Sequence, residues 1–164
     1  MNRLWTPWRM PYLRGEDKRP DGCIFCHKLQ CSDDQEHILY RGESCYVTLN
    51  RYPYSNGHLM VIPYVHVPSL EDLDVLTLTE MMRIVNHSLA ALREAYAPHG
   101  FNVGVNLGQA AGAGIADHVH MHVVPRWTAD TNFMPVVGRT RVIPELLDEA
   151  YARLKPIFAR LSQS

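Results

Sequence analysis

The chain has 164 residues, of which 46% are hydrophobic, and its formal net charge is −1. This size and apolar content indicate one folded domain over residues 1–164, and the lack of a basic excess argues against a nucleic-acid polymer as partner. No apolar run has the length of a membrane span and the first residues lack the core of a secretory signal, so we expect a cytoplasmic protein without membrane contact.

Residues 1–22 form an N-terminal arm that is rich in aromatic, proline and charged residues. Trp5, Trp8 and Tyr12 alternate with prolines, without a helical or strand period. Segments of this kind usually pack over a core or against a partner subunit, where large amphipathic rings contribute most. We therefore expect packing rather than direct ligand contact from this arm.

A Cys-x-x-Cys pair, Cys23 and Cys26, follows the arm. Two thiolates at this spacing can share one zinc ion, but a tetrahedral site needs two more ligands. The alternative is a pair of half-buried free cysteines. Candidates for the missing ligands are His27, Cys31, His37, His66 and the histidines within residues 118–122.

Short runs that are rich in β-branched and aromatic residues predict strands, and a turn-forming loop at residues 51–57 predicts that the two strands beside it are antiparallel. Asn50 and His58 bracket this loop, where polar side chains can point into a cleft. The expected strands are residues 38–40, 45–50, 58–63, 101–107 and 117–127.

Two amphipathic helices are expected. Apolar residues recur at three- and four-residue steps over residues 70–97, with Ser69 as a candidate N-cap. Residues 143–162 form the second amphipathic segment, at the C-terminus. Strands combined with one long helix and one terminal helix place the chain in the α+β class.

The segment 117–127 carries the strongest chemical signal. His118, His120 and His122 alternate with apolar residues, so a strand here would align three imidazoles on one face, with neighbours roughly 7 Å apart. Pro125 lacks an amide donor and predicts a strand end or an edge. Two chemistries remain open: neutral imidazoles can bind a metal, or one can act as a nucleophile while its neighbours manage charge and protons.

Residues 108–114, immediately before this segment, are almost all glycine and alanine. Side chains this small let backbone N–H groups approach a ligand closely, as they do in loops that hold phosphate oxygens. The loop matches neither the Walker nor the dinucleotide fingerprint. Next to three histidines, it predicts an anion cradle.

Residues 118–124 fit the pattern His-φ-His-φ-His-φ-φ, where φ is apolar, and the sequence resembles the histidine triad (HIT) superfamily of nucleotide hydrolases and nucleotidyl transferases. The resemblance implies a HIT fold, with an antiparallel β-sheet of about five strands, one long helix and a C-terminal helix. It also implies a homodimer or a higher homo-oligomer. The chain looks most similar to the bacterial diadenosine tetraphosphate phosphorylase branch in residues 4–7, 52–54, 57–61, 99–104 and 124–127.

The resemblance also assigns expected roles to individual residues. His120 is the expected nucleophile that takes the nucleotidyl group, His122 is expected to contact phosphate oxygens and assist proton transfer, and His118 completes the triad. The expected nucleotide contacts are His122, Asn50, His58, Asn106, Trp127 and the backbone of Ala113 and Gly114.

Zinc-bearing relatives hold a structural zinc through a Cys-x-x-Cys pair, a histidine after an apolar strand and the first triad histidine. Cys23, Cys26, His66 and His118 occupy the matching places, so the resemblance implies structural zinc and no organic cofactor. His118 would then be a ligand, and His120 would be left to attack.

The expected activity is cleavage of a dinucleoside polyphosphate, such as diadenosine tetraphosphate, at its α-phosphorus through a nucleotidyl-histidine intermediate, with phosphate or water as acceptor. Three alternatives stay open at this stage. They are a HIT-type hydrolase of nucleoside phosphoramidates or AMP esters, a zinc-stabilised nucleotide-binding module with little catalysis, and a metallohydrolase that uses all three histidines.

Overall fold

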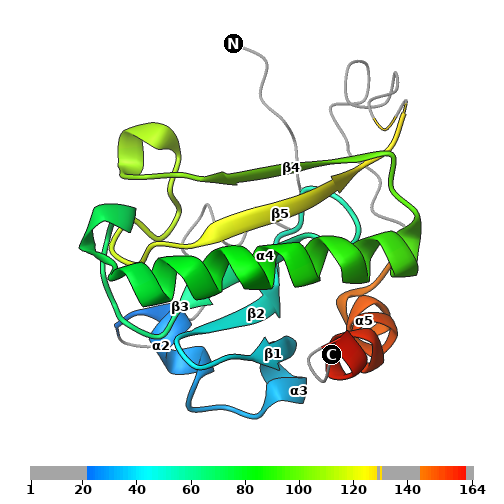
Figure 1. Ribbon diagram of the computed structural model, residues 1–164, viewed down its shortest axis with the longest axis horizontal. Coiled ribbons are helices and arrows are strands. Elements are labelled where there is room, and N and C mark those ends of the chain that lie inside the picture. The colour runs from blue at the N-terminus through cyan, green and yellow to red at the C-terminus, as the bar shows by residue number, and fades with distance from the viewer. Residues whose placement is uncertain (1–21, 129, 131–144, 162–164) are drawn as a thin grey trace.

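The computed structural model describes residues 22–128, 130 and 145–161 (Figure 1). Apart from Gly22, the predicted N-terminal arm lies outside the described residues. The same holds for residues 143, 144 and 162 of the predicted C-terminal segment. None of the described helices combines the length and apolar character needed to cross a membrane.

The described strands form one sheet in the order β1-β2-β3-β5-β4, and every neighbouring pair is antiparallel. The expected antiparallel sheet of about five strands is therefore confirmed. The strands are β1 (Ile38–Arg41), β2 (Cys45–Leu49), β3 (Leu59–Pro63), β4 (Gly100–Val105) and β5 (Met121–Arg126).

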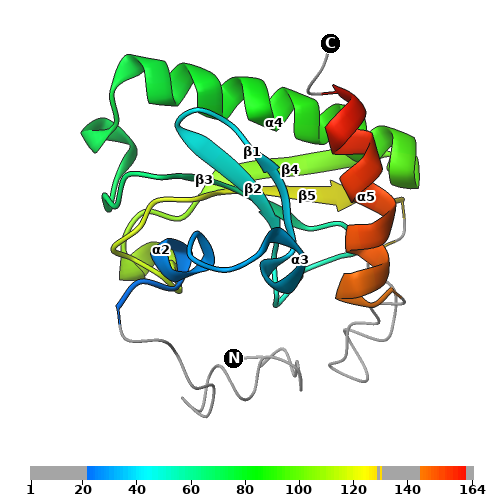
Figure 2. The same cartoon turned by 90° about the horizontal axis from the view of Figure 1, so that it is seen from below.

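The expected long helix and terminal helix are both present. The long helix packs along one face of the sheet, while α2 lies on the other face (Figure 2). The C-terminal helix packs against α4 and β1. The helices are α2 (Ile24–Lys28), α3 (Asp33–Glu36), α4 (Val75–Tyr96) and α5 (Leu147–Leu161), with single 3-10 turns η2 (Leu70–Asp72) and η3 (Gln109–Ala111).

Strand β2 shows how the sequence builds two apolar layers. Its alternate side chains Cys45, Val47 and Leu49 belong to the core between the sheet and α4, whereas Tyr46 belongs to a smaller core with Phe25 of α2. A strand alternates its side chains between the two faces of a sheet, so a central strand that is covered on both sides is apolar throughout. The smaller core holds α2 against the sheet.

The predicted start of the long helix at Ser69 is wrong. Leu73 adopts an extended conformation (φ −88°, ψ 143°) after the turn η2, and it separates that turn from α4. The Asp74 side chain then accepts a hydrogen bond from the Thr77 N–H at 2.7 Å and caps the helix. An aspartate can satisfy the otherwise unpaired amide groups of a first helical turn, so α4 begins after Asp74.

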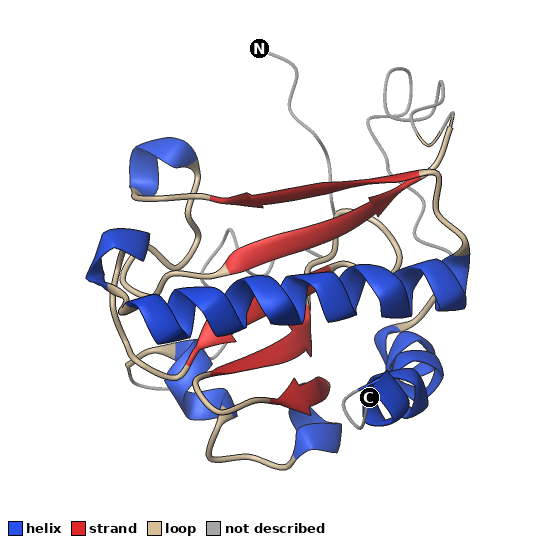
Figure 3. Cartoon of the chain, in the orientation of Figure 1, coloured by secondary structure: helices blue, strands red, loops and turns tan. Residues whose placement is uncertain are grey.

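The predicted histidine strand starts too early. β5 begins at Met121, because its pairing with both β3 and β4 extends only to that residue. A loop leads into the strand (Figure 3). Strand β3 pairs with β5 only as far as Val123, so Pro125 lies beyond β3 although it still pairs with β4. The proline therefore marks an edge on one side of a continuing strand, as its missing amide donor allows.

Candidate active site

The three histidines share one side of the segment even though only His122 lies within β5. Val119, between the first two histidines, is buried in the core on the α4 side, and its N–H donates to the Val67 carbonyl at 2.7 Å. The histidine rings instead gather near Phe25, whose centroid lies 5.5 Å from that of His118 and 4.8 Å from that of His120. The side chains of residues 118–122 therefore still alternate between the two faces, although residues 118–120 lie outside the regular strand.

His118 lies against the two cysteines of α2. Its Nδ1 is 3.2 Å from Cys23 Sγ and 3.7 Å from Cys26 Sγ, and His66 Nδ1 is 3.4 Å from Cys26 Sγ. One ligand atom from each of these four residues lies within 4.8 Å of every other. The four residues predicted as zinc ligands are thus brought together, and we call them the Cys2His2 cluster.

The Cys2His2 cluster fits a zinc ion in spacing and in chemistry. A tetrahedral zinc separates its sulfur and nitrogen ligands by roughly 3.5 Å, given bond lengths of about 2.3 and 2.0 Å. His118 Nε2 donates to the Pro63 carbonyl at 2.9 Å, which leaves the Nδ1 lone pair facing the thiols. Burial and the neighbouring Cys23 thiol raise the pKa of Cys26, an electrostatic penalty that a bound cation would reverse.

His120 has a different environment although it is only two residues away. It is 5% exposed, and its Nδ1 donates to the His118 carbonyl at 2.9 Å. The neutral ring therefore carries its lone pair on Nε2. Burial lowers the pKa of His120, and the hydrogen bond to the carbonyl partly opposes that shift. A neutral imidazole of fixed tautomer suits a nucleophile.

His122 is oriented by a chain of ring contacts. The Tyr54 N–H donates to His58 Nδ1 at 3.0 Å, so neutral His58 carries its proton on Nε2. His58 Nε2 then donates to His122 Nδ1 at 3.0 Å. This chain places the proton of neutral His122 on its own Nε2, the tautomer that can donate a hydrogen bond to an oxygen.

His120 and His122 line a pocket between α2, the loop after β2 and the glycine-rich loop. Five of the predicted site residues meet there: Asn50, Asn106, Gly114, His120 and His122. Apolar side chains form much of its wall: Ile24, Phe25, Met60 and Ile115. Such a wall suits the flat face of a nucleobase, and the two histidines suit a phosphate.

Four of the predicted catalytic and nucleotide-binding residues lie away from this pocket in the described part of the chain. His118 belongs to the Cys2His2 cluster, and His58 is fully buried behind His122. Trp127 is half-buried and donates through Nε1 to the Tyr96 carbonyl at 3.4 Å. The Ala113 N–H donates to the Gly108 carbonyl at 3.3 Å, which occupies an amide that we expected to hold phosphate.

The glycine-rich loop has positive φ angles at Gly108 (φ 76°) and Gly112 (φ 88°), on either side of the turn η3. These values are open to glycine at little cost, which explains the residue type. The Gly114 N–H meets no acceptor among the described residues, and Gly114 lines the pocket. The loop therefore offers one amide, at Gly114, for an anion.

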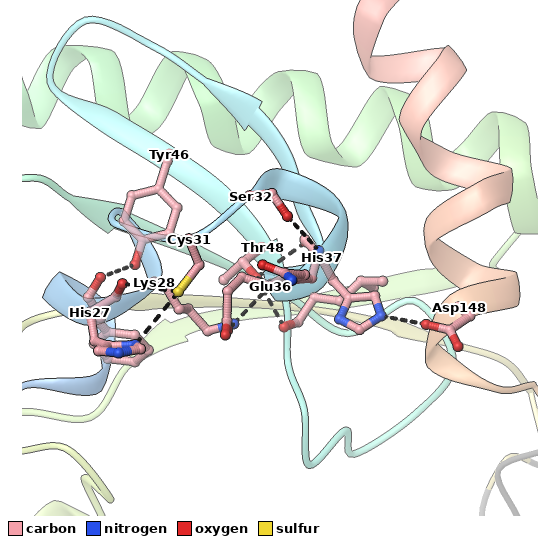
Figure 4. Close-up of polar contacts among 12 residues, drawn as sticks. His27, Lys28, Cys31, Ser32, Glu36, His37, Tyr46, Thr48 and Asp148 are labelled. Carbon is pink, nitrogen blue, oxygen red and sulfur yellow. Dashed lines mark hydrogen bonds and ion pairs between the residues drawn. The ribbon is translucent and has the colours of Figure 1, made fainter. Parts of the chain in front are cut away.

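An ion pair in the pocket wall was not predicted from the sequence. Lys28 is 6% exposed, and its Nζ donates to the Glu36 carboxylate at 2.8 Å and to the Glu36 carbonyl at 2.9 Å (Figure 4). Both residues line the pocket. The sequence of residues 32–37 indicates a solvated turn, and no sequence pattern links Lys28 with Glu36, eight positions later. The pair forms where α3, which packs against β1, meets α2.

Comparison with known proteins gives consistent results. The HIT domain family matches residues 32–129. A Mycobacterium tuberculosis protein named AP-4-A phosphorylase is 42% identical, over 98% of this chain and 86% of its own length. The Schizosaccharomyces pombe bis(5'-nucleosyl)-tetraphosphatase [asymmetrical] is 32% identical, over 57% of this chain and 50% of its own. The crystal structure of a Zn-bound histidine triad family protein from Mycobacterium smegmatis superimposes with a TM-score of 0.70 at 28% identity, covering 87% of this chain and 96% of that one.

Proposed function

The chain belongs to the HIT family, and on that premise we propose that it cleaves a dinucleoside polyphosphate, such as diadenosine tetraphosphate, at an α-phosphorus through a nucleotidyl-histidine intermediate on His120. One observation carries the assignment of the nucleophile. His120 lines the pocket with its Nδ1 bound to a carbonyl, so its lone pair is on Nε2, while its neighbour His118 faces the cysteines.

In the first step, the Nε2 lone pair of His120 forms a bond to phosphorus, and the phosphorus–oxygen bond to the rest of the polyphosphate breaks with its electron pair on oxygen. The His122 Nε2–H donates a hydrogen bond to that oxygen and stabilises its negative charge, so the polyphosphate leaves as an anion. Attack leaves positive charge on the His120 ring, and the His118 carbonyl stabilises this charge through the hydrogen bond from Nδ1.

In the second step, an oxygen of the acceptor bonds to phosphorus, the nitrogen–phosphorus bond breaks, and the electron pair returns to His120. With phosphate as acceptor the attacking oxygen is already anionic and needs no proton removed, and the His122 N–H hydrogen-bonds to the phosphate oxygens. We propose inorganic phosphate as the acceptor, which makes the enzyme a phosphorylase, and the relative named AP-4-A phosphorylase supports this choice. The Gly114 N–H would hold an oxygen of the transferred phosphate.

Of the remaining predicted contact residues, some would touch the substrate and others would hold their neighbours in place. Asn50 and Asn106 line the pocket and would hold the ribose and the phosphate side of the nucleotide. His58 would act as a positioning residue, because it contacts His122 and Asn50, which line the pocket, and does not line it itself. Ala113 and Trp127 would contribute through the shape of the loops that carry them.

Cys23, Cys26, His66 and His118 would hold zinc. The ion would supply a structural cross-link between α2, the segment after β3 and the start of the histidine segment. The zinc-bound relative and the spacing of the four ligand atoms support this role. A reducing compartment such as the cytoplasm, the location that we propose, would keep both thiols available as ligands.

We also propose a homodimer built on β4. This strand pairs only with β5 among the described strands, and its outer residues are exposed, with Val103 at 42% and Leu107, just beyond the strand, at 40%. An apolar, unpaired strand edge is a surface that a second copy can cover. Light scattering should give twice the chain mass, and Val103→Lys should shift it toward the monomer.

The activity is tested by incubating the protein with diadenosine tetraphosphate with and without inorganic phosphate, and with a chelator. We expect ADP and ATP with phosphate, at an initial rate that brief chelation does not change. AMP and ATP regardless of phosphate would identify a hydrolase. Loss of the initial rate on chelation would point to metal-dependent hydrolysis, and the absence of product would leave a nucleotide-binding module.

A further inference from the structure

A second group of potential metal ligands lies on the outer side of α2. It consists of His27, Cys31 and Glu36, and one ligand atom from each lies within 4.8 Å of the others. The sequence named His27 and Cys31 as candidates to complete the Cys-x-x-Cys site, but the structure places them apart from that cluster. Adjacent helical residues project about 100° apart, which allows Cys26 to face the Cys2His2 cluster while His27 faces Cys31.

The local geometry explains why these side chains meet. The Gln30 and Cys31 N–H groups donate to the His27 and Lys28 carbonyls at 3.0 and 3.2 Å, so the chain makes one further tight turn after α2. That turn brings Cys31 Sγ to 3.8 Å from His27 Nδ1 (Figure 4). The separation is close to the 3.2 to 3.7 Å found between sulfur and nitrogen in the Cys2His2 cluster.

Glu36 reaches the same place from α3 and is held there. Lys28 Nζ donates to both its carboxylate and its carbonyl, which fixes the end of α3 against α2. A carboxylate has two oxygens, so Glu36 can keep its bond to Lys28 and still offer an oxygen to a cation. Its position therefore does not depend on a bound ion.

We propose that His27, Cys31 and Glu36 form a second, exchangeable zinc site. A thiolate, an imidazole and a carboxylate are all zinc ligands, and the thiolate disfavours magnesium and calcium. Three protein ligands leave one tetrahedral position open to water, the arrangement of zinc sites that exchange ligands. His27 is exposed and Cys31 is half-buried, so the ion can enter from solvent and binds more weakly than at the Cys2His2 cluster.

The test is zinc stoichiometry, measured on reduced protein that has been stripped with a chelator and then titrated with zinc in competition with a colorimetric indicator. The wild type should bind one zinc per chain more than Cys31→Ser and one more than His27→Ala. Glu36→Gln should weaken this additional zinc at least tenfold. The matched control Glu43→Gln removes an exposed carboxylate outside the cluster and should leave the stoichiometry unchanged.

The decisive quantity is the difference between wild type and variant, so it does not depend on whether the Cys2His2 cluster is occupied. Equal stoichiometry in the wild type, Cys31→Ser and His27→Ala would overturn the proposal. Cobalt provides a second readout, because a thiolate that binds it produces a charge-transfer band. The absorbance that Cys31→Ser loses should correspond to one thiolate per chain, and an unchanged spectrum would contradict the site. Circular dichroism of each variant checks that the fold is retained.

Discussion

Two imidazoles two residues apart, His118 and His120, differ in which ring nitrogen the protein holds. The His118 Nε2–H donates a hydrogen bond to the Pro63 carbonyl, and its Nδ1 faces the cysteines. The His120 Nδ1–H donates a hydrogen bond to the His118 carbonyl, and the ring lines the pocket. This difference suits the proposed roles, His118 as a metal ligand and His120 as a nucleophile. In each ring a backbone carbonyl fixes the tautomer, and with it the nitrogen that is left available.

Removing the His120 ring tests the catalytic half of this comparison and should have the largest effect. His120→Asn eliminates the nitrogen that bonds to phosphorus, so we expect kcat to fall by roughly 10⁴ or more while nucleotide binding persists. Steady-state rates and equilibrium binding of a nucleotide measure the two properties. His87→Asn, on α4 across the sheet, is the matched control. A His120→Asn rate within tenfold of the wild type would contradict the assignment.

Removing a cysteine tests the metal half of the comparison through stability. Zinc at a hundred times its Kd stabilises a folded protein by about 2.7 kcal/mol, which corresponds to roughly 5 to 10 °C in Tm for a chain of this size. Zinc should therefore raise the Tm of the stripped protein by this amount but leave that of the same protein carrying Cys23→Ser unchanged. Both proteins should carry Cys31→Ser, so that the second cluster does not contribute. Equal Tm shifts in the two would disprove the Cys2His2 assignment.

Removing the hydrogen bond that orients His122 tests whether its tautomer matters for catalysis, and we expect a smaller effect. His58→Phe keeps a buried ring but removes the donor to His122 Nδ1, so either tautomer of His122 becomes accessible. We expect kcat to fall about tenfold, with little change in KM, because the orientation of the His122 hydrogen-bond donor is lost while the pocket wall is kept. His87→Phe serves as control. A rise in KM at constant kcat would instead make His58 a substrate contact.

Alternating apolar residues in short runs predicted the strands, because that information is local, and the resemblance to the HIT superfamily supplied their arrangement in one antiparallel sheet. The class, the antiparallel sheet of about five strands and the two helices are confirmed. The start of β5 was wrong because it depends on how far β3 and β4 extend, and no pattern within residues 117–127 encodes the length of its neighbours. The start of α4 was wrong because Ser69 and Asp74 are both good caps and only the extended Leu73 distinguishes them.

The sequence predicted only those residues of the candidate site that belong to one sequence pattern or motif. The histidine alternation indicated a common face, and the resemblance supplied the four ligands that the structure places together. The position of His58 behind His122 depends on the path of a loop, and the Lys28–Glu36 pair depends on the packing of α3. Contacts of this kind join segments that have no shared period, so they become visible only in three dimensions.

The most direct measurement of the central claim is to trap the intermediate. The protein is mixed with diadenosine tetraphosphate labelled in its α-phosphates, quenched with base, digested and sequenced by mass spectrometry. The account predicts an adenylyl group on His120, present without added phosphate and removed when phosphate is supplied. A label on His118, His122 or a cysteine, or turnover with no labelled residue, would contradict it.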